Sequence, residues 1–292
     1  MQFRTVSIAA FLLVATWSAT TTFGAIQVVN PNNPSGDNFT NPGAVNTGQD
    51  IVGTDWYYNN VRNNGVVGIN TAYPRSGNGS VYFNGPNPIA LSSKADIEFL
   101  PNATQNLATG NYSSGGVLGS LGQLSSLAYD WYRDSSSVNT PIQHPSLRLQ
   151  VVSPDLSQFG YLVFERAYNG FGPTVPTDAW QSDNIFGSNY RMWSNGTLPD
   201  SGVDVGSRTL SQWRTDFPDY LVVGVSSGFG SGWDSFRGAV DNITFGFNGN
   251  DTTYNFEAQG AVPEPMTFAV WGFLGLCGFA YARHAAMKRQ HG

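Results

Sequence analysis

Alternation of apolar and polar residues in the middle of the chain constrains its fold more than any other feature of the sequence. The segment 127–133 reads Leu-Ala-Tyr-Asp-Trp-Tyr-Arg, and the segments 147–153 and 161–166 repeat the same period of two. This period places successive side chains on opposite faces of an extended chain, so each segment is predicted to be a half-buried β-strand. Asp155, Ser157 and Gly160 mark a turn between the last two segments, which predicts that they pair as a hairpin.

The rest of the region between residues 26 and 260 offers short β-prone runs separated by Gly, Asn and Pro. Strands are expected at 66–69, 80–83, 96–100, 179–186, 190–193, 220–226, 239–247 and 253–257. The segment 26–49 is predicted to hold one edge strand and a long loop. One short helix is predicted at 208–215, with Ser207 as its N-cap. Its residues Leu210 and Trp213 should face inward.

The three alternating segments are expected to form one sheet with an apolar face, and such a face must be covered. The single predicted helix is too short to cover it, so a second sheet is required. Strands joined by short turns are antiparallel. The sequence therefore predicts an all-β fold, an antiparallel sandwich of two sheets.

The last thirty residues have three parts in a fixed order. They are the motif Pro263, Glu264 and Pro265, an apolar run over 266–282, and a basic cluster that includes Arg283, Lys288 and Arg289. Each proline denies the preceding residue a helical conformation, so Glu264 is expected in an extended segment. The apolar run would be about 26 Å long as a helix, near the lower limit for spanning a bilayer. The basic cluster predicts a cytoplasmic end for this helix.

This tail resembles the PEP-CTERM sorting signal of bacterial envelope proteins. The resemblance implies that an exosortase-type sorting protease recognises and removes the tail and that the remainder reaches the cell surface or its exopolysaccharide. An ordinary single-pass membrane anchor behind a proline-rich stalk is the alternative interpretation.

The amino terminus has the layout of a secretory signal peptide, with Arg4, an apolar core over 6–17, and small residues up to Ala25. Three parts are therefore expected: a signal peptide at 1–25, a β-sandwich ectodomain at 26–260, and the sorting signal with its transmembrane helix at 261–292.

Charge and cysteine content exclude several functions for the region 26–260. Nine Arg and one Lys face nineteen Asp and Glu there, a formal charge of −9 that argues against nucleic acid as a partner. The only cysteine of the chain is Cys277, inside the apolar tail. No disulfide, thiolate nucleophile or cysteine-ligated metal is therefore expected in the ectodomain.

The segment 230–247 and the order of strands resemble jelly-roll sandwiches of the kind found in carbohydrate-binding modules. In those modules an Asp on the last strand commonly ligates a structural calcium ion, and the resemblance implies this role for Asp241 with Asn242. Oxygen ligands and the lack of Cys and His suit Ca²⁺. The alternative is that Asp241 caps a turn or pairs with Arg237.

Aromatic residues next to polar loops are the other candidates for a binding site. Exposed rings beside amides and carboxylates suit sugar faces and hydroxyls. The candidate residues are Trp56, Trp180, Trp193 and Trp233. Because Trp is usually at least half-buried, at least two of these four are expected in the core, together with Trp131 and Trp213.

Motifs of catalysis are scarce. His144 is the only histidine between residues 26 and 260 and is expected in a solvated loop, which removes His-based triads and multi-His metal sites. A glycoside hydrolase or polysaccharide lyase would need paired carboxylates. Glu98, Glu165 and Glu257 are expected on separate strands, and the sequence has no clustered E-x-D-x-x-E pattern of the kind that places two acids on one strand face. Glu165 is expected on the solvent side of its strand.

These observations predict a non-enzymatic, surface-sorted protein of the envelope or exopolysaccharide matrix, with a lectin-like carbohydrate-binding module as the alternative. A lectin would expose two or more Trp or Tyr rings in one cleft, an enzyme would place two carboxylates across it, and a matrix protein would have neither.

Overall fold

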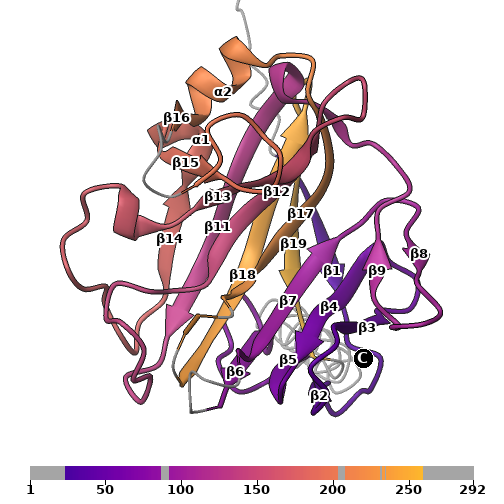
Figure 1. Ribbon diagram of the computed structural model, residues 1–292. Helices are drawn as coiled ribbons and strands as arrows, with labels where there is room; N and C mark the ends of the chain where they lie inside the picture. Colours follow the sequence, from indigo (N-terminus) through magenta and orange to yellow (C-terminus); the bar gives the residue numbers. More distant parts are fainter. Residues whose placement is uncertain (1–23, 87–91, 203–207, 231, 234, 259–292) are drawn as a thin grey trace, which may run out of the picture.

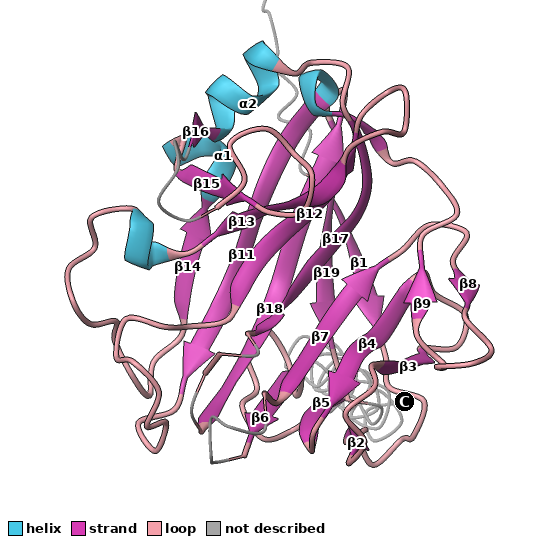
Figure 2. Cartoon of the chain, viewed as in Figure 1, coloured by secondary structure: helices cyan, strands magenta, loops and turns pink. Residues whose placement is uncertain are grey.

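The structure is a computed structural model that describes residues 24–86, 92–202, 208–230, 232–233 and 235–258. Two large β-sheets form two layers, with two short helices at one end (Figures 1 and 2). The predicted sandwich of two sheets is confirmed. A further small hairpin consists of β8 (Thr104–Gln105) and β9 (Tyr112–Ser113).

The first sheet has eight described strands. They are β1 (Ala25–Val29), β19 (Asn250–Phe256), β18 (Phe236–Phe247), β6 (Ser80–Gly85), β5 (Gly65–Asn70), β2 (Phe39–Asn41), β11 (Leu124–Arg133) and β14 (Gln181–Asn184). The second sheet has nine. They are β16 (Arg208–Thr209), β15 (Arg191–Ser194), β13 (Phe159–Phe164), β12 (Ser146–Val152), β17 (Leu221–Phe229), β7 (Lys94–Phe99), β4 (Trp56–Arg62), β3 (Thr47–Asp50) and β10 (Gly119–Ser120).

The three alternating segments are strands, as predicted, but they do not share one sheet. β12 and β13 form the predicted antiparallel hairpin in the nine-stranded sheet. β11 pairs with β14 and β18 in the other sheet. The prediction of one sheet was wrong because the chain between β11 and β12 crosses from one layer to the other, and a period of two is the same in either layer.

One strand pair departs from the antiparallel prediction. β1 lies parallel to β19, with Ala25 beside Thr252 and Val29 beside Phe256. The whole sandwich connects these two strands, so their parallel pairing needs no crossover helix. The predicted long loop at 26–49 was also wrong in part, since it contains β2 and β3.

The apolar sides of both sheets meet in one core. Leu127, Tyr129 and Trp131 of β11 are buried, and so are Leu147 and Leu149 of β12. Residues of both sheets belong to a single hydrophobic cluster. Their burial away from water is the main stabilising contribution to such a sandwich.

The predicted short helix exists as α2 (Leu210–Asp216), and Leu210 and Trp213 are buried as expected. Its N-cap is Thr209 rather than the predicted Ser207. The Thr209 hydroxyl accepts a hydrogen bond from the Gln212 backbone amide, and the Thr209 backbone amide donates to Gln212 Oε1, which forms a capping box. The described residues contain three further one-turn helices, which are α1 (Ile185–Ser188), Leu121–Gln123 and Arg166–Tyr168.

The long strand β18 changes partner half-way along its length. Residues 236–240 pair with β6 and residues 243–247 pair with β19, while β11 follows the other edge. Asp241 and Asn242 lie between the two halves, and Asn242 has a left-handed φ of 49°. Asn tolerates this conformation better than most residues, so it suits the irregularity that the change of partner requires.

Several predictions fall outside the described residues. They are the signal peptide up to residue 23, the motif Pro263, Glu264 and Pro265, the apolar run, and the basic residues Arg283, Lys288 and Arg289. Among the residues that are described, no helix is both long and apolar enough to cross a membrane.

Candidate binding pocket on the nine-stranded sheet

The face of the nine-stranded sheet that points away from the core carries charged residues on its central strands. In β7, the apolar Ala95, Ile97 and Phe99 face the core. Lys94, Asp96 and Glu98 alternate with them, so they occupy the opposite face. In β12, Ser146, Arg148 and Gln150 alternate in the same way with three core residues.

Asp96 joins two cations on this face. Its carboxylate lies 3.0 Å from Lys94 Nζ and 2.8 Å from Arg148 Nη1. Burial alone would raise the pKa of Asp96, but the attraction of Arg148 and Lys94 outweighs burial and holds this pKa below its ordinary value. The same carboxylate raises the pKa of the Arg148 guanidinium despite its burial. Asp96 and Arg148 are therefore both charged at neutral pH.

Glu98 lies next to this cluster in an amide environment. Its carboxyl oxygens accept hydrogen bonds from Asn59 at 2.6 Å, Asn60 at 3.1 Å and Gln150 at 3.2 Å. Burial and the nearby Asp96 raise the pKa of Glu98, which favours its neutral form.

The loop that contains β9 covers this end of the face. Asn59 donates to the Tyr112 carbonyl at 2.9 Å, and the Tyr112 amide donates back to Asn59 Oδ1 at 2.9 Å. The Asn60 amide donates to Asn111 Oδ1 at 2.9 Å. Glu98 and Asp96 are consequently almost fully buried beneath the surface of this face.

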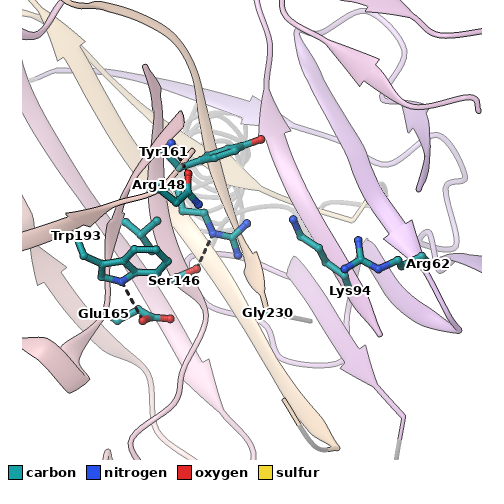
Figure 3. A pocket seen from close by; sticks show the side chains of 10 residues that line it. Arg62, Lys94, Ser146, Arg148, Tyr161, Glu165, Trp193 and Gly230 are labelled. Atoms are coloured by element: carbon teal, nitrogen blue, oxygen red, sulfur yellow. Dashed lines mark hydrogen bonds between the residues drawn. The ribbon is translucent and has the colours of Figure 1, made fainter. Parts of the chain in front are cut away.

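A pocket of about 230 Å³ remains on the same face, next to the charged cluster. Side chains from β4, β7, β12, β13 and β15 surround it (Figure 3). The lining residues are Arg62, Lys94, Ser146, Arg148, Tyr161, Val163, Glu165, Trp193, Asn195 and Gly230.

Aromatic side chains form one wall of the pocket. Trp193 of β15 lies beside Val163 of β13 in the sheet register, and Tyr161 precedes Val163 on the same face. Both rings are half-buried. Trp193 Nε1 donates to Glu165 Oε2 at 3.2 Å, and burial raises the pKa of Glu165 in spite of this bond.

Cationic side chains form the opposite wall. Arg62 and Lys94 are cross-strand neighbours at the ends of β4 and β7. Arg62 donates to Asn46 Oδ1 at 2.6 Å and to the Ser92 carbonyl at 3.2 Å. No carboxylate within the described residues forms an ion pair with Arg62. Arg148 reaches the same space, held by Ser146 Oγ at 2.8 Å (Figure 3).

The structure separates the four predicted tryptophans. Trp56 is fully buried and packs at 5.0 Å from Phe256 in the core, and Trp233 is 8% exposed, so neither presents a free ring. This confirms that at least two of the four are core residues, and it corrects Trp56 and Trp233 as binding candidates. Trp131 and Trp213 are buried, as predicted.

The other two tryptophans lie on different sheets. Trp180 precedes β14 of the eight-stranded sheet, tilts against Tyr132 at 5.7 Å and donates to the Pro74 carbonyl. Trp193 is the predicted candidate that lines the pocket described above. The four residues therefore do not form one cleft.

Asp241 and Asn242, the predicted calcium ligands, form hydrogen bonds with other residues of the protein. Asp241 is fully buried, and its oxygens accept hydrogen bonds from the amides of Phe256 at 2.9 Å and Ser76 at 3.3 Å. Asn242 donates to Asp130 at 2.8 Å and to Ser76. Within the described residues, no group of three or more His, Cys, Asp or Glu could hold a metal ion. The contacts favour the capping alternative, and calcium at this pair stays a prediction.

Two expectations about acidic and histidine residues were wrong. Asp96 and Glu98 share one face of β7, although no such acid pair was expected. His144 is 1% exposed rather than solvated, because its ring stacks on Trp131 at 4.3 Å. Burial lowers the pKa of His144 to about 4, so its ring is neutral. Glu165 does lie on the outer face as expected, although it is half-buried.

Sequence reasoning missed most of the pocket, although signals for it were present. Residues 94–99 read Lys-Ala-Asp-Ile-Glu-Phe, which is a full alternation of charged and apolar residues. Lys94 is also the only lysine between residues 26 and 260. Charged residues at every second position of a strand predict one polar face, but nothing in the sequence indicates that Arg62 or Trp193 lies beside that face.

No protein-family model and no curated protein sequence matches this chain. Two solved structures share a loose likeness. A family 11 carbohydrate-binding module from Clostridium thermocellum, in complex with a β-1,3-1,4-mixed-linked tetrasaccharide, has a TM-score of 0.37 and 11% identity over 70% of this chain and 96% of its own. A structure described as explaining promiscuous specificity in carbohydrate-binding modules of the β-sandwich superfamily has a TM-score of 0.29 and 14% identity, over 68% of this chain and 55% of its own. Both likenesses are too loose to support an inference about this chain.

Proposed function

We propose that this protein binds carbohydrate in the pocket on its nine-stranded sheet. The observation that carries the proposal is the pairing of two half-buried aromatic side chains, Trp193 and Tyr161, with polar and charged side chains around one open pocket. Aromatic rings pack against the apolar faces of sugar rings, and N–H and O–H groups satisfy the sugar hydroxyls.

The residues around the pocket favour a lectin-like module over the two other classes. Two aromatic rings in one pocket meet the criterion for a lectin, and a matrix protein with no binding role would not require them. Among the described lining residues, only Glu165 carries a carboxyl group. A glycosidase mechanism needs two carboxyl groups across the substrate, so the pocket favours binding over hydrolysis.

Matched substitutions of aromatic residues test this proposal. On a glycan array, the purified full chain should bind a saccharide, and Trp193→Ala or Tyr161→Ala should weaken that binding by about tenfold or more. Tyr132→Ala is the control, because Tyr132 is also half-buried but lies on the eight-stranded sheet. Melting temperatures of all variants separate loss of binding from loss of folding. Binding that survives both pocket substitutions in folded protein would refute this site.

We further propose that the pocket works outside the cell. The signal-peptide layout at 1–25 and the three-part tail at 261–292 support secretion, transient single-pass anchoring and processing by an exosortase-type protease. An exopolysaccharide at the cell surface would then be the accessible ligand. A protein that binds this polymer would be a matrix component and a lectin-like module at the same time.

A further inference from the structure

We propose that the pocket selects an acidic saccharide, and that Arg62, Lys94 and Arg148 hold its anionic group. This inference rests on the glycan-binding function proposed above and names the class of glycan. The anionic group is a uronic acid carboxylate or a sulfate ester, because both offer oxygens to the same N–H donors.

The three cations come from separate strands and reach one space. Arg62 ends β4, Lys94 begins β7 beside it, and Arg148 extends from β12 (Figure 3). All three line the same pocket. Arginine and lysine placed around one pocket can donate several charge-assisted hydrogen bonds to one oxyanion.

Cationic side chains outnumber acidic side chains in the lining of the pocket. Asp96 alone compensates both Lys94 and Arg148, at 3.0 and 2.8 Å. Arg62 adds a third positive charge, with neutral oxygens as its hydrogen-bond partners. Three cationic side chains and one acidic side chain, that of Glu165, therefore line the pocket, so cationic groups outnumber carboxyl groups on its surface.

Two acidic groups besides Asp96 lie at or near the pocket. Glu165 lines the aromatic wall and Glu98 lies beside Asp96, and burial raises the pKa of both. The Glu98 carboxyl is almost fully buried and accepts hydrogen bonds from Asn59, Asn60 and Gln150. The Glu165 carboxyl accepts a hydrogen bond from Trp193. Both acidic groups therefore have hydrogen-bond donors other than the three cations. Lys94 is partly buried and Arg148 is buried, which strengthens their attraction for an anion relative to bulk water.

The cations of the pocket contrast with the negative net charge of the region 26–260. The region 26–260 has a formal charge of −9, so a polyanion is repelled by the molecule in general. Binding of an acidic polymer therefore needs a local positive site rather than general charge attraction. The pocket contains the only lysine of that region, together with Arg62, which forms no ion pair with any described carboxylate.

The experiment compares acidic polysaccharides with neutral forms of the same polymers. Polygalacturonate, alginate and hyaluronate are each tested against the purified full chain beside their carboxyl-reduced derivatives. Dextran sulfate beside dextran forms the sulfate arm and separates the two sources of negative charge. We expect at least one acidic polymer to bind about tenfold or more tightly than its neutral form, and the affinity to fall as salt rises.

Arg62→Gln tests the cationic wall, because Arg62 is half-buried and lacks a buried carboxylate partner that its loss would leave unpaired. This variant should weaken binding of the acidic polymer by about tenfold, whereas Arg62→Lys should retain most of it. Arg237→Gln is the control, since it removes the same charge from an exposed position on β18 of the other sheet.

The results distinguish this inference from the proposed function. Equal affinity for acidic and neutral forms, with both lost in Trp193→Ala, would overturn acidic selectivity and leave glycan binding standing. Tight binding of acidic polymers that Arg62→Gln does not change while Arg237→Gln abolishes it would overturn the pocket as the anion site. Failure to bind any saccharide would overturn both proposals.

Discussion

At the scale of single residues, Asp96 is a buried charge that pairs with two cations on the outer face of the nine-stranded sheet. Its carboxylate is fully buried, yet Lys94, Arg148 and Asn60 satisfy both of its oxygens. Such a buried ion pair contributes little net stability compared with an apolar replacement, but removing one partner leaves uncompensated charge. Asp96 therefore holds the two cations in place at the edge of the pocket.

Asp96→Asn tests this role. The substitution leaves Lys94 and Arg148 close together without a carboxylate between them, so we expect a loss of about 3–5 kcal/mol in the free energy of unfolding. Asp200→Asn is the matched control, because the ion pair of Asp200 with Arg208 is far more exposed to solvent than that of Asp96 and should contribute less than about 1 kcal/mol. Urea-induced unfolding of the two variants measures both values. Equal losses would show that Asp96 does not organise a buried cluster.

At the scale of elements, β18 connects the two halves of its sheet by changing partner from β6 to β19. The Asp241 carboxyl occupies the point of change and accepts the Phe256 amide of β19 and the Ser76 amide near β6. Burial raises the pKa of Asp241 to about 7, in spite of these hydrogen bonds. The Asp241 carboxyl therefore stabilises the point where β18 changes partner, and it can hold its proton near neutral pH.

This raised pKa predicts a pH dependence of stability. Between its ordinary pKa of 3.8 and about 7, Asp241 holds a proton in the native state that the unfolded chain has released. The free energy of unfolding should therefore fall as pH rises through this window. The difference amounts to at most about 4 kcal/mol.

Asp241→Asn should remove this contribution, so unfolding curves at pH 4 and pH 8 should differ less for the variant than for the natural chain. Asp219→Asn changes an exposed carboxyl outside the sheets and should keep the natural pH dependence. If Ca²⁺ instead raised the melting temperature of the natural chain and not of Asp241→Asn, the calcium prediction would replace the proton account.

At the scale of the whole molecule, the core between the sheets places the charged face and the aromatic wall on one outer surface. The nine-stranded sheet brings residues from Arg62 to Gly230 around one pocket. The eight-stranded sheet supplies the opposite layer and carries Trp180 with Tyr132. The two ends of the chain add the proposed route to the cell surface.

Glu264→Ala tests that route, because it removes the displayed acid and leaves the apolar run unchanged. The full-length form should then accumulate in the membrane fraction, while Gln259→Ala, upstream of the motif, should be processed normally. Membrane fractionation and the mass of the released form provide the measurement. Release of Glu264→Ala at the normal mass would contradict the sorting proposal.

The sequence by itself determined the class of fold, because local patterns carry that information. Alternation identified β11, β12 and β13, turn residues identified the β12–β13 hairpin, and spacing identified α2 with its inward Leu210 and Trp213. The need to cover apolar faces then required a second sheet. These properties depend on neighbours within a few residues of each other.

Only the tertiary structure decided which strands are neighbours and which rings are free. A strand has the same period of two in either sheet, so the place of β11 and the parallel pairing of β1 with β19 depend on distant partners. Trp56 and Trp193 both adjoin polar segments in the sequence, yet one is covered by the opposite layer and the other lines the pocket. The pocket itself exists because hydrogen bonds between strands far apart in the chain bring Arg62, Arg148 and Trp193 to one surface, and no local pattern records that convergence.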